Sequence, residues 1–309
     1  MQAGRQELNL GSTRLIGTGD WSNISRTFDA LRLGLGRDGT RFSIFSAAVV
    51  HVDPTRFNTW QAGQKVSGVH GSLTKLVPRA SVEPYVLWKT LPQARGESGK
   101  SGGADIYTIG ARWAGLLPHG FDYAVEMARQ AGHYSSDRVG AWAGYWIGGY
   151  TPPRMTLKPH FTIKYGYASG DSNPRDGRAG TFDQLYSTVR DLNGISDQVG
   201  WRNIRQIRGG VELKPQASLN LTFNYHFFRL ASAFDGLYNS RGILVVRAPT
   251  SRARHSDVGQ ESDIFLTYAL TRQVSLGAGY AHFFPGRFLK EYSPGHATSF
   301  PYASCTYRF

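Results

Sequence analysis

The amino-acid sequence predicts an all-β protein that crosses a membrane as an antiparallel up-and-down β-barrel of about fourteen strands. Apolar and polar residues alternate in segments of roughly ten residues, the length of a tilted membrane-spanning strand. The 37 Gly, 16 Tyr, 17 Phe and 7 Trp suit tight turns and aromatic belts. Mean hydropathy is −0.34, and no apolar run approaches the roughly 18 residues of a spanning helix, which excludes a helical membrane protein.

The alternating segments cover the whole chain without a linker, so residues 1–309 are expected to form a single barrel domain. They lie near residues 2–9, 26–36, 40–51, 66–76, 80–91, 103–115, 119–133, 137–150, 156–169, 202–214, 217–230, 259–271, 274–284 and 299–309. An even number of antiparallel strands is the expectation for a bacterial barrel.

The connections between these segments alternate in length. Short turns, such as residues 37–39 and 77–79, alternate with longer connections, such as residues 52–65 and 170–201, and the short connection at 134–136 departs from the rule. Outer-membrane barrels place short turns in the periplasm and long loops outside the cell. This parity predicts that the chain ends on the periplasmic side.

The last segment, residues 299–309, ends on an aromatic residue. Tyr307, Cys305 and Ala303 share one phase of the alternation, while Arg308 and Thr306 share the other. Tyr307 and Phe309 are predicted to form the assembly signal of an outer-membrane barrel, which implies a Gram-negative outer membrane, with its lipid and the barrel-assembly machinery as partners. An edge strand of a soluble β-domain is the alternative.

Strand alternation also places charged side chains opposite apolar neighbours. Arg32 alternates with Leu31 and Leu33, which predicts that Arg32 points away from lipid. The same test predicts an inward direction for the basic residues Arg112, Lys164 and Arg208 and for the acidic residues Glu126, Glu212 and Asp263. Together with a net charge of +13, these positions predict a bore that attracts an anionic solute. Charged pairs that only brace the wall are the alternative.

No catalytic residue, metal-ligand set or cofactor is predicted. His226 faces inward, but no serine partner can be assigned to it, so an outer-membrane hydrolase is a lesser alternative. Residues 171–177 carry the carboxylates of a calcium loop, but Arg175 stands at the fifth position and the glycine comes one place late. Nucleic-acid binding is disfavoured because the aromatic residues occupy the strand phase opposite the basic residues.

Residues 168–204 contain three motifs in succession: Ser-Gly-Asp at 169–171, Thr-Phe-Asp-Gln-Leu-Tyr at 181–186 and Gly-Trp-Arg-Asn at 200–203. In this order they resemble the alginate-export family of outer-membrane barrels. Further stretches agree with the family, so that the resemblance spans nearly the whole chain: residues 4–8, 21–29, 227–231, 258–263 and 279–286.

The resemblance implies a barrel of about eighteen strands, with opening strands and a signal peptide that precede residues 1–309. It implies an alginate-export type of porin that passes an anionic polysaccharide or a small anionic solute, with periplasmic secretion partners. It further implies that Arg5, Arg26, Asp29 and Glu261 line the pore. A barrel with a structural or adhesive role is the alternative, and the sequence names neither the solute nor the direction of transport.

Overall fold

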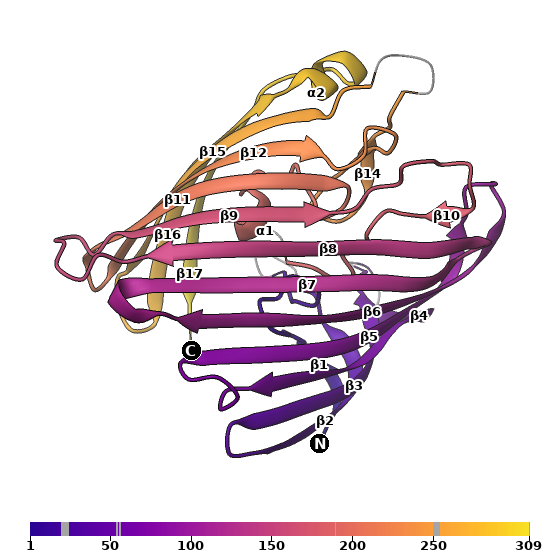
Figure 1. The fold of residues 1–309 in the computed structure, drawn as a ribbon. Coiled ribbons are helices and arrows are strands. Elements are labelled where there is room, and N and C mark those ends of the chain that lie inside the picture. The colour runs from indigo at the N-terminus through magenta and orange to yellow at the C-terminus, as the bar shows by residue number, and fades with distance from the viewer. Residues whose placement is uncertain (20–24, 54, 56, 189, 250–253, 309) are drawn as a thin grey trace.

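The computed structural model describes residues 1–19, 25–53, 55, 57–188, 190–249 and 254–308. The long strands of its main sheet pair antiparallel, each with the long strand before and after it in the chain (Figure 1). In sheet order the strands are β1 (Gln2–Gln6), β2 (Phe28–Arg37), β3 (Thr40–His51), β4 (Thr59–Leu73), β5 (Ala80–Arg95), β6 (Ser101–Leu116), β7 (Phe121–Tyr134), β8 (Asp137–Tyr150), β9 (His160–Ala168), β11 (Ile204–Gln216), β12 (Leu219–Leu230), β15 (Asp257–Ala269), β16 (Val274–Pro285) and β17 (Thr298–Tyr307). These strands confirm the predicted all-β antiparallel fold, and each overlaps one predicted segment. They extend furthest beyond the predicted segments at β4, which begins seven residues before the segment 66–76, and at β5, which ends four residues after the segment 80–91.

Smaller elements interrupt the connections in the part of the chain that the structure describes. They are the 3-10 turn η1 (Pro118–Gly120), the two-stranded sheet of β13 (Leu237–Tyr238) with β14 (Leu244–Val246), the short strand β10 (Arg178–Ala179), which pairs with β8, and the short helices α1 (Arg190–Asn193) and α2 (Arg287–Tyr292). Among the described residues, no helix is long and apolar enough to cross a bilayer.

Short turns gather at one end of the sheet and long connections at the other (Figure 1). The β2–β3 turn shows why a turn forms where it does: Asp38 and Gly39 both have positive φ, of 48° and 85°, which the short polar Asp and the Cβ-free Gly tolerate. The β7–β8 connection is the predicted exception, because it is short but lies at the end with the long connections. We call the end with the short turns the turn end and the end with the long connections the loop end.

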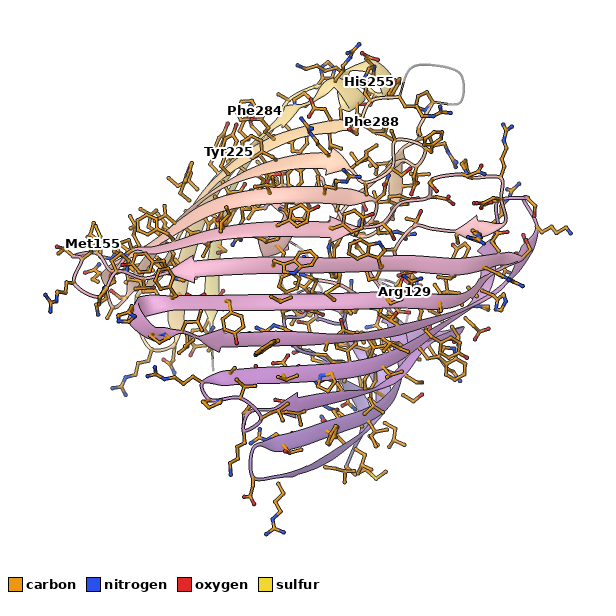
Figure 2. The ribbon with its side chains drawn as sticks, in the orientation of Figure 1. Arg129, Met155, Tyr225, His255, Phe284 and Phe288 are labelled. Carbon is orange, nitrogen blue, oxygen red and sulfur yellow. The ribbon has the colours of Figure 1, made fainter. Side chains whose placement is uncertain are left out.

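The two faces of the sheet differ in the way the alternation predicts. Leu31, Ile109 and Ile264 are exposed on the outer face, where lipid would cover them. Phe45, Ala143 and Phe283 are buried on the inner face. Tyr225 and Phe284 project from the outer side of the wall in Figure 2. An apolar outer surface and a packed interior suit a barrel whose surrounding solvent is lipid.

The sheet path ends at β1 and at β17, and in the described part of the chain neither strand pairs on its second side. Cys305 lies opposite Leu276 on the outer face, in the apolar phase that the sequence predicts. Arg308 donates its backbone N–H to the carbonyl of Gln273, so the described chain leaves the sheet at the turn end.

Candidate functional site

Two long connections fold back along the inner face of the sheet at the loop end. They are residues 8–18 of the β1–β2 connection and residues 180–188 and 192–203 of the β9–β11 connection, which we call the inner plug. The apolar side chains of Leu8, Ile16, Phe182 and Trp201 are almost completely buried against wall residues. The hydrophobic core of this barrel is therefore built between the inner plug and the wall, because the outer face has no protein to pack against.

The two parts of the inner plug pair with each other. Ile16 and Tyr186 form a parallel bridge, in which the N–H of Gly17 donates to the Tyr186 carbonyl at 3.0 Å and the N–H of Tyr186 donates to the Leu15 carbonyl at 2.9 Å. Arg26 joins them, since its guanidinium donates to the carbonyls of Gly17 at 2.8 Å and Tyr186 at 2.6 Å. Backbone donors and acceptors that leave the sheet thus find partners inside the bore.

The Thr-Phe-Asp-Gln-Leu-Tyr motif fixes the inner plug to strands β5 and β7. The Lys89 ammonium lies 2.8 Å from one Asp183 oxygen and 3.0 Å from the other. Gln130 uses its side-chain amide to bond both the N–H and the carbonyl of Asp183, at 2.8 and 2.7 Å. Burial alone would raise the pKa of Asp183, but the charges of Lys89 and Arg202 outweigh it and lower that pKa. Asp183 is therefore held as a carboxylate.

A second attachment lies on the other side of the bore. Ser196 donates its backbone N–H and its hydroxyl to the Glu261 carboxylate, at 2.9 and 2.7 Å. Lys164 and Gln206 both donate to the carbonyl of Leu192 at the end of α1. Charged and amide side chains of the wall here serve to hold a connection, and they are completely buried or nearly so.

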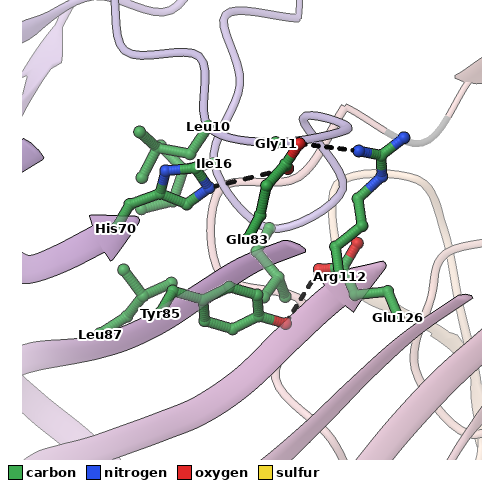
Figure 3. A pocket seen from close by; sticks show the side chains of 10 residues that line it. Leu10, Gly11, Ile16, His70, Glu83, Tyr85, Leu87, Arg112 and Glu126 are labelled. Carbon is green, nitrogen blue, oxygen red and sulfur yellow. Dashed lines mark hydrogen bonds and ion pairs between the residues drawn. The ribbon is translucent and has the colours of Figure 1, made fainter. Parts of the chain in front are cut away.

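A third contact region joins the tip of residues 8–18 to strands β4–β7 (Figure 3). Arg112 donates to Glu83 at 2.9 Å, and His70 lies 3.9 Å from the same carboxylate. The Glu126 carboxylate accepts the hydroxyl of Tyr85 at 2.9 Å and that of Ser12 at 3.1 Å. The cavity that these described residues line is only about 10 Å³, so residues 8–18 pack closely against the wall here.

The turn end of the bore is hollow instead. A cavity of about 960 Å³ lies there, and we call it the vestibule. Its charged lining consists of Arg79, Arg112, Lys158 and Lys214 with Asp122 and Glu212, and His160 also faces it. Lys214 lies 3.1 Å from Glu212, and His160 lies 3.6 Å from Asp122. Strand alternation alone did not identify Arg79 and Lys158, because both lie in turns, where the period of two no longer applies.

Most of the predicted pore residues are on the inner face, and they divide into two groups by their exposure to solvent. Arg32, Arg112, Arg208 and Glu212 keep some exposure, and Arg112 and Glu212 line the vestibule. The other group is buried at the level of the inner plug: Lys164, Glu126, Glu261 and Asp263. Contact of any of these residues with a permeant stays a prediction.

Three further predictions need correction or fall outside the structure. Asp29 pairs with Arg5 across β1 and β2 in the strand phase of Leu31, so both lie on the outer face and form an ion pair at 2.9 Å. The expected position of Arg5 and Asp29 in the bore is therefore wrong. Arg26 lies in the β1–β2 connection, where it bonds the inner plug. Tyr307 ends β17, while Phe309 lies outside the described residues.

His226 has no arrangement that suits catalysis. Its Nε2 lies 3.0 Å from the Asp263 carboxylate, and its Nδ1 bonds the side-chain amide of Gln206 at 2.7 Å. Glu261, which is opposite His226 across β12 and β15, accepts the hydroxyl of Ser196. Within the described ranges no group of three or more His, Cys, Asp or Glu residues could hold a metal ion.

Comparison with known proteins agrees with this architecture. The crystal structure of Pseudomonas aeruginosa OccD3 (OpdP) has a TM-score of 0.63 and 12% sequence identity, over 98% of this chain and 73% of that chain. The crystal structure of Pseudomonas aeruginosa OccK11 (OpdR) has a TM-score of 0.58 and 11% identity, over 98% of this chain and 76% of that chain. Identities this low establish the fold alone. No curated protein sequence matches the chain.

The family model for alginate export matches residues 1–302. It covers both connections of the inner plug and all of the strands except the last residues of β17. The chain thus belongs to the alginate-export family and is a channel-type β-barrel of the bacterial outer membrane rather than an enzyme.

Proposed function

We propose that this protein passes an anionic polysaccharide or a smaller anionic solute through the outer membrane without catalysing a reaction on it. The observation that carries the proposal is the lining of the vestibule, where four Lys and Arg residues stand against two Asp and Glu residues. A basic, water-accessible recess attracts carboxylates and raises their local concentration at the mouth of the bore. Several weak contacts allow a polyanion to enter and also to leave.

Arg79 and Lys158 are the best positions for testing this proposal. Both line the vestibule, and no ion pair in the described structure involves them. Replacing both with Glu is expected to shift the ion preference of the channel from anions towards cations, as measured by reversal potentials in planar bilayers. The effect should weaken as salt rises, because the screening length falls from about 10 Å at 0.1 M to about 3 Å at 1 M.

Arg37→Glu is the matched control. Arg37 is at the same end of the sheet, but it is highly exposed, pairs with Asp38 and does not line the vestibule. It should leave the reversal potential unchanged. If the vestibule variant folds normally and keeps the wild-type reversal potential, its basic residues do not select the permeant.

We also propose that the free edges of β1 and β17 are paired in the membrane, by the opening strands that the family resemblance implies. Backbone donors and acceptors left unpaired in hydrocarbon cost several kcal/mol each, so open edges are not stable there. Residues 298–307 should then show slow amide exchange in lipid. Rapid exchange along the whole of β17 would contradict closure at that edge.

A further inference from the structure

Arg14 is the residue of the inner plug whose surroundings fit its chemistry least. Its side chain is only 1% exposed. None of its three guanidinium nitrogens makes a hydrogen bond of normal geometry to a described residue, and the Tyr145 hydroxyl is the polar side-chain group beside it. A buried guanidinium without acceptors is costly, because five N–H donors have lost water and gained no partner.

Aromatic rings and nearby charges surround Arg14. The guanidinium carbon lies 4.2 Å from the ring centre of Tyr145 and 4.8 Å from that of Trp201. Stacking of this kind stabilises a desolvated cation but leaves its N–H donors unused. Lys164 and Arg208 lie near enough to repel it, and Glu126 near enough to attract it.

The acceptors that could serve Arg14 are directed elsewhere. The two oxygens of Glu126 accept hydroxyl groups from Tyr85 and Ser12. The Tyr145 hydroxyl donates its proton to Ser12 at 3.1 Å, so only one neutral oxygen is left to serve the five N–H donors of Arg14. Arg26 is a useful contrast, because this second arginine of the β1–β2 connection has two carbonyl acceptors within 2.8 Å.

We propose that Arg14 is a binding residue for a carboxylate-bearing permeant, covered while the inner plug is docked and accessible when it leaves the wall. The inference rests on the proposed passage of anions. A carboxylate supplies the two-pronged acceptor that the docked state lacks. Because such a ligand binds only the undocked state, it shifts the equilibrium towards opening. The permeant thereby promotes its own passage.

The test uses the full chain in planar bilayers at low salt, with hexagalacturonate as the acidic probe and maltohexaose as the neutral probe. Hexagalacturonate should raise the opening frequency of the wild type several-fold, whereas maltohexaose should not. Arg14→Met removes the desolvated charge and keeps the apolar stem, so its basal opening should fall about tenfold, with no response to hexagalacturonate. A response of this variant equal to that of the wild type overturns the inference.

Arg26→Met is the matched control. It removes the donors to Gly17 and Tyr186, so basal opening should rise, and the response to hexagalacturonate should persist. Loss of that response although Arg14 is intact would mean that the response does not depend specifically on Arg14, which overturns its role. Reversal potentials are recorded on the same channels. A wild type without anion preference refutes the proposed function, whereas an anion-selective wild type that does not open with hexagalacturonate refutes only the inference.

Hydrogen exchange on the wild type keeps the inference testable if Arg14→Met fails to assemble. The N–H groups of Gly17, Tyr186 and Thr188 bond within the inner plug. Hexagalacturonate should speed their exchange, while maltohexaose should not. Equal exchange rates with both sugars overturn the inference.

Discussion

The two ends of the bore share one wall and one strand alternation, yet they offer opposite environments. At the turn end, the Lys214–Glu212 pair has side-chain exposures of 58% and 32% and borders a cavity of about 960 Å³. At the loop end, the Lys89–Asp183 pair has exposures of 10% and 9% and lies under the inner plug. The comparison shows that an inward-facing charge has no fixed role: connections that cover it convert a lining residue into an attachment point.

The largest effect is expected from breaking the buried pair. Lys89→Met leaves the Asp183 carboxylate in the interior without its main cation, and removing one partner of a buried pair costs about 3–5 kcal/mol. The inner plug should therefore undock in most molecules, which would be measured as a large rise in single-channel opening frequency.

Lys214→Met is the control for that prediction. It removes a lysine from the exposed pair in the vestibule, and exposed pairs contribute only about 0–1 kcal/mol. Its opening frequency should remain near that of the wild type. Equal opening of the two variants would contradict the assignment of Lys89 as an attachment point.

A medium effect is expected at Gly194, where the inner plug lies close to Glu261 of the wall. Its φ is +94°, and an added Cβ would lie 2.5 Å from a Glu261 carboxylate oxygen. Gly194→Ala should weaken the contact of Ser196 with Glu261 and speed exchange of the Ser196 amide. The control Gly177→Ala has a similar φ of +72°, but nothing lies within 4 Å of its added Cβ, so it tests backbone strain without the clash. Similar exchange at Ser196 in both variants would exclude the steric explanation.

The smallest effect concerns the outer loops at the loop end. The N–H of Gly177 donates to Glu97 at 2.9 Å. Burial, together with a hydrogen bond to Asp171, raises the pKa of Glu97 to about 7. The folded loops thus bind this proton more tightly than the unfolded chain does, so the packing of Glu97 against Asp171 is most stable below the ordinary Glu pKa and weakens as pH rises through about 7. The Gly177 N–H, in contrast, favours the ionised form of Glu97 and lowers its pKa.

After correction for the intrinsic rate, exchange of the Asp171 amide, which donates to Asp235 at 3.1 Å, should be slower at about pH 5 than at about pH 8. Glu97→Gln, which carries no titrating proton, should remove most of this difference. A pH dependence unchanged by that substitution would assign the effect to another group.

The sequence by itself determined the strands and their faces, because the side-chain period of two is local and each strand needs only its own residues to express it. Arg32 and Arg208 are inward for this reason. The same alternation placed Asp29 in the outward phase of Leu31, and the family resemblance misled where it assigned that residue to the bore.

Only the tertiary structure decided which inward residues are covered. The Thr-Phe-Asp-Gln-Leu-Tyr motif is visible in the sequence, but its contact with Lys89 joins residues 94 positions apart, and no local period encodes such a contact. Arg14 lies outside any predicted strand, so only the folded connections bring it between Tyr145 and Trp201. Long connections have no repeating geometry, and they take their path from what they pack against, which in this barrel is the inside of the wall.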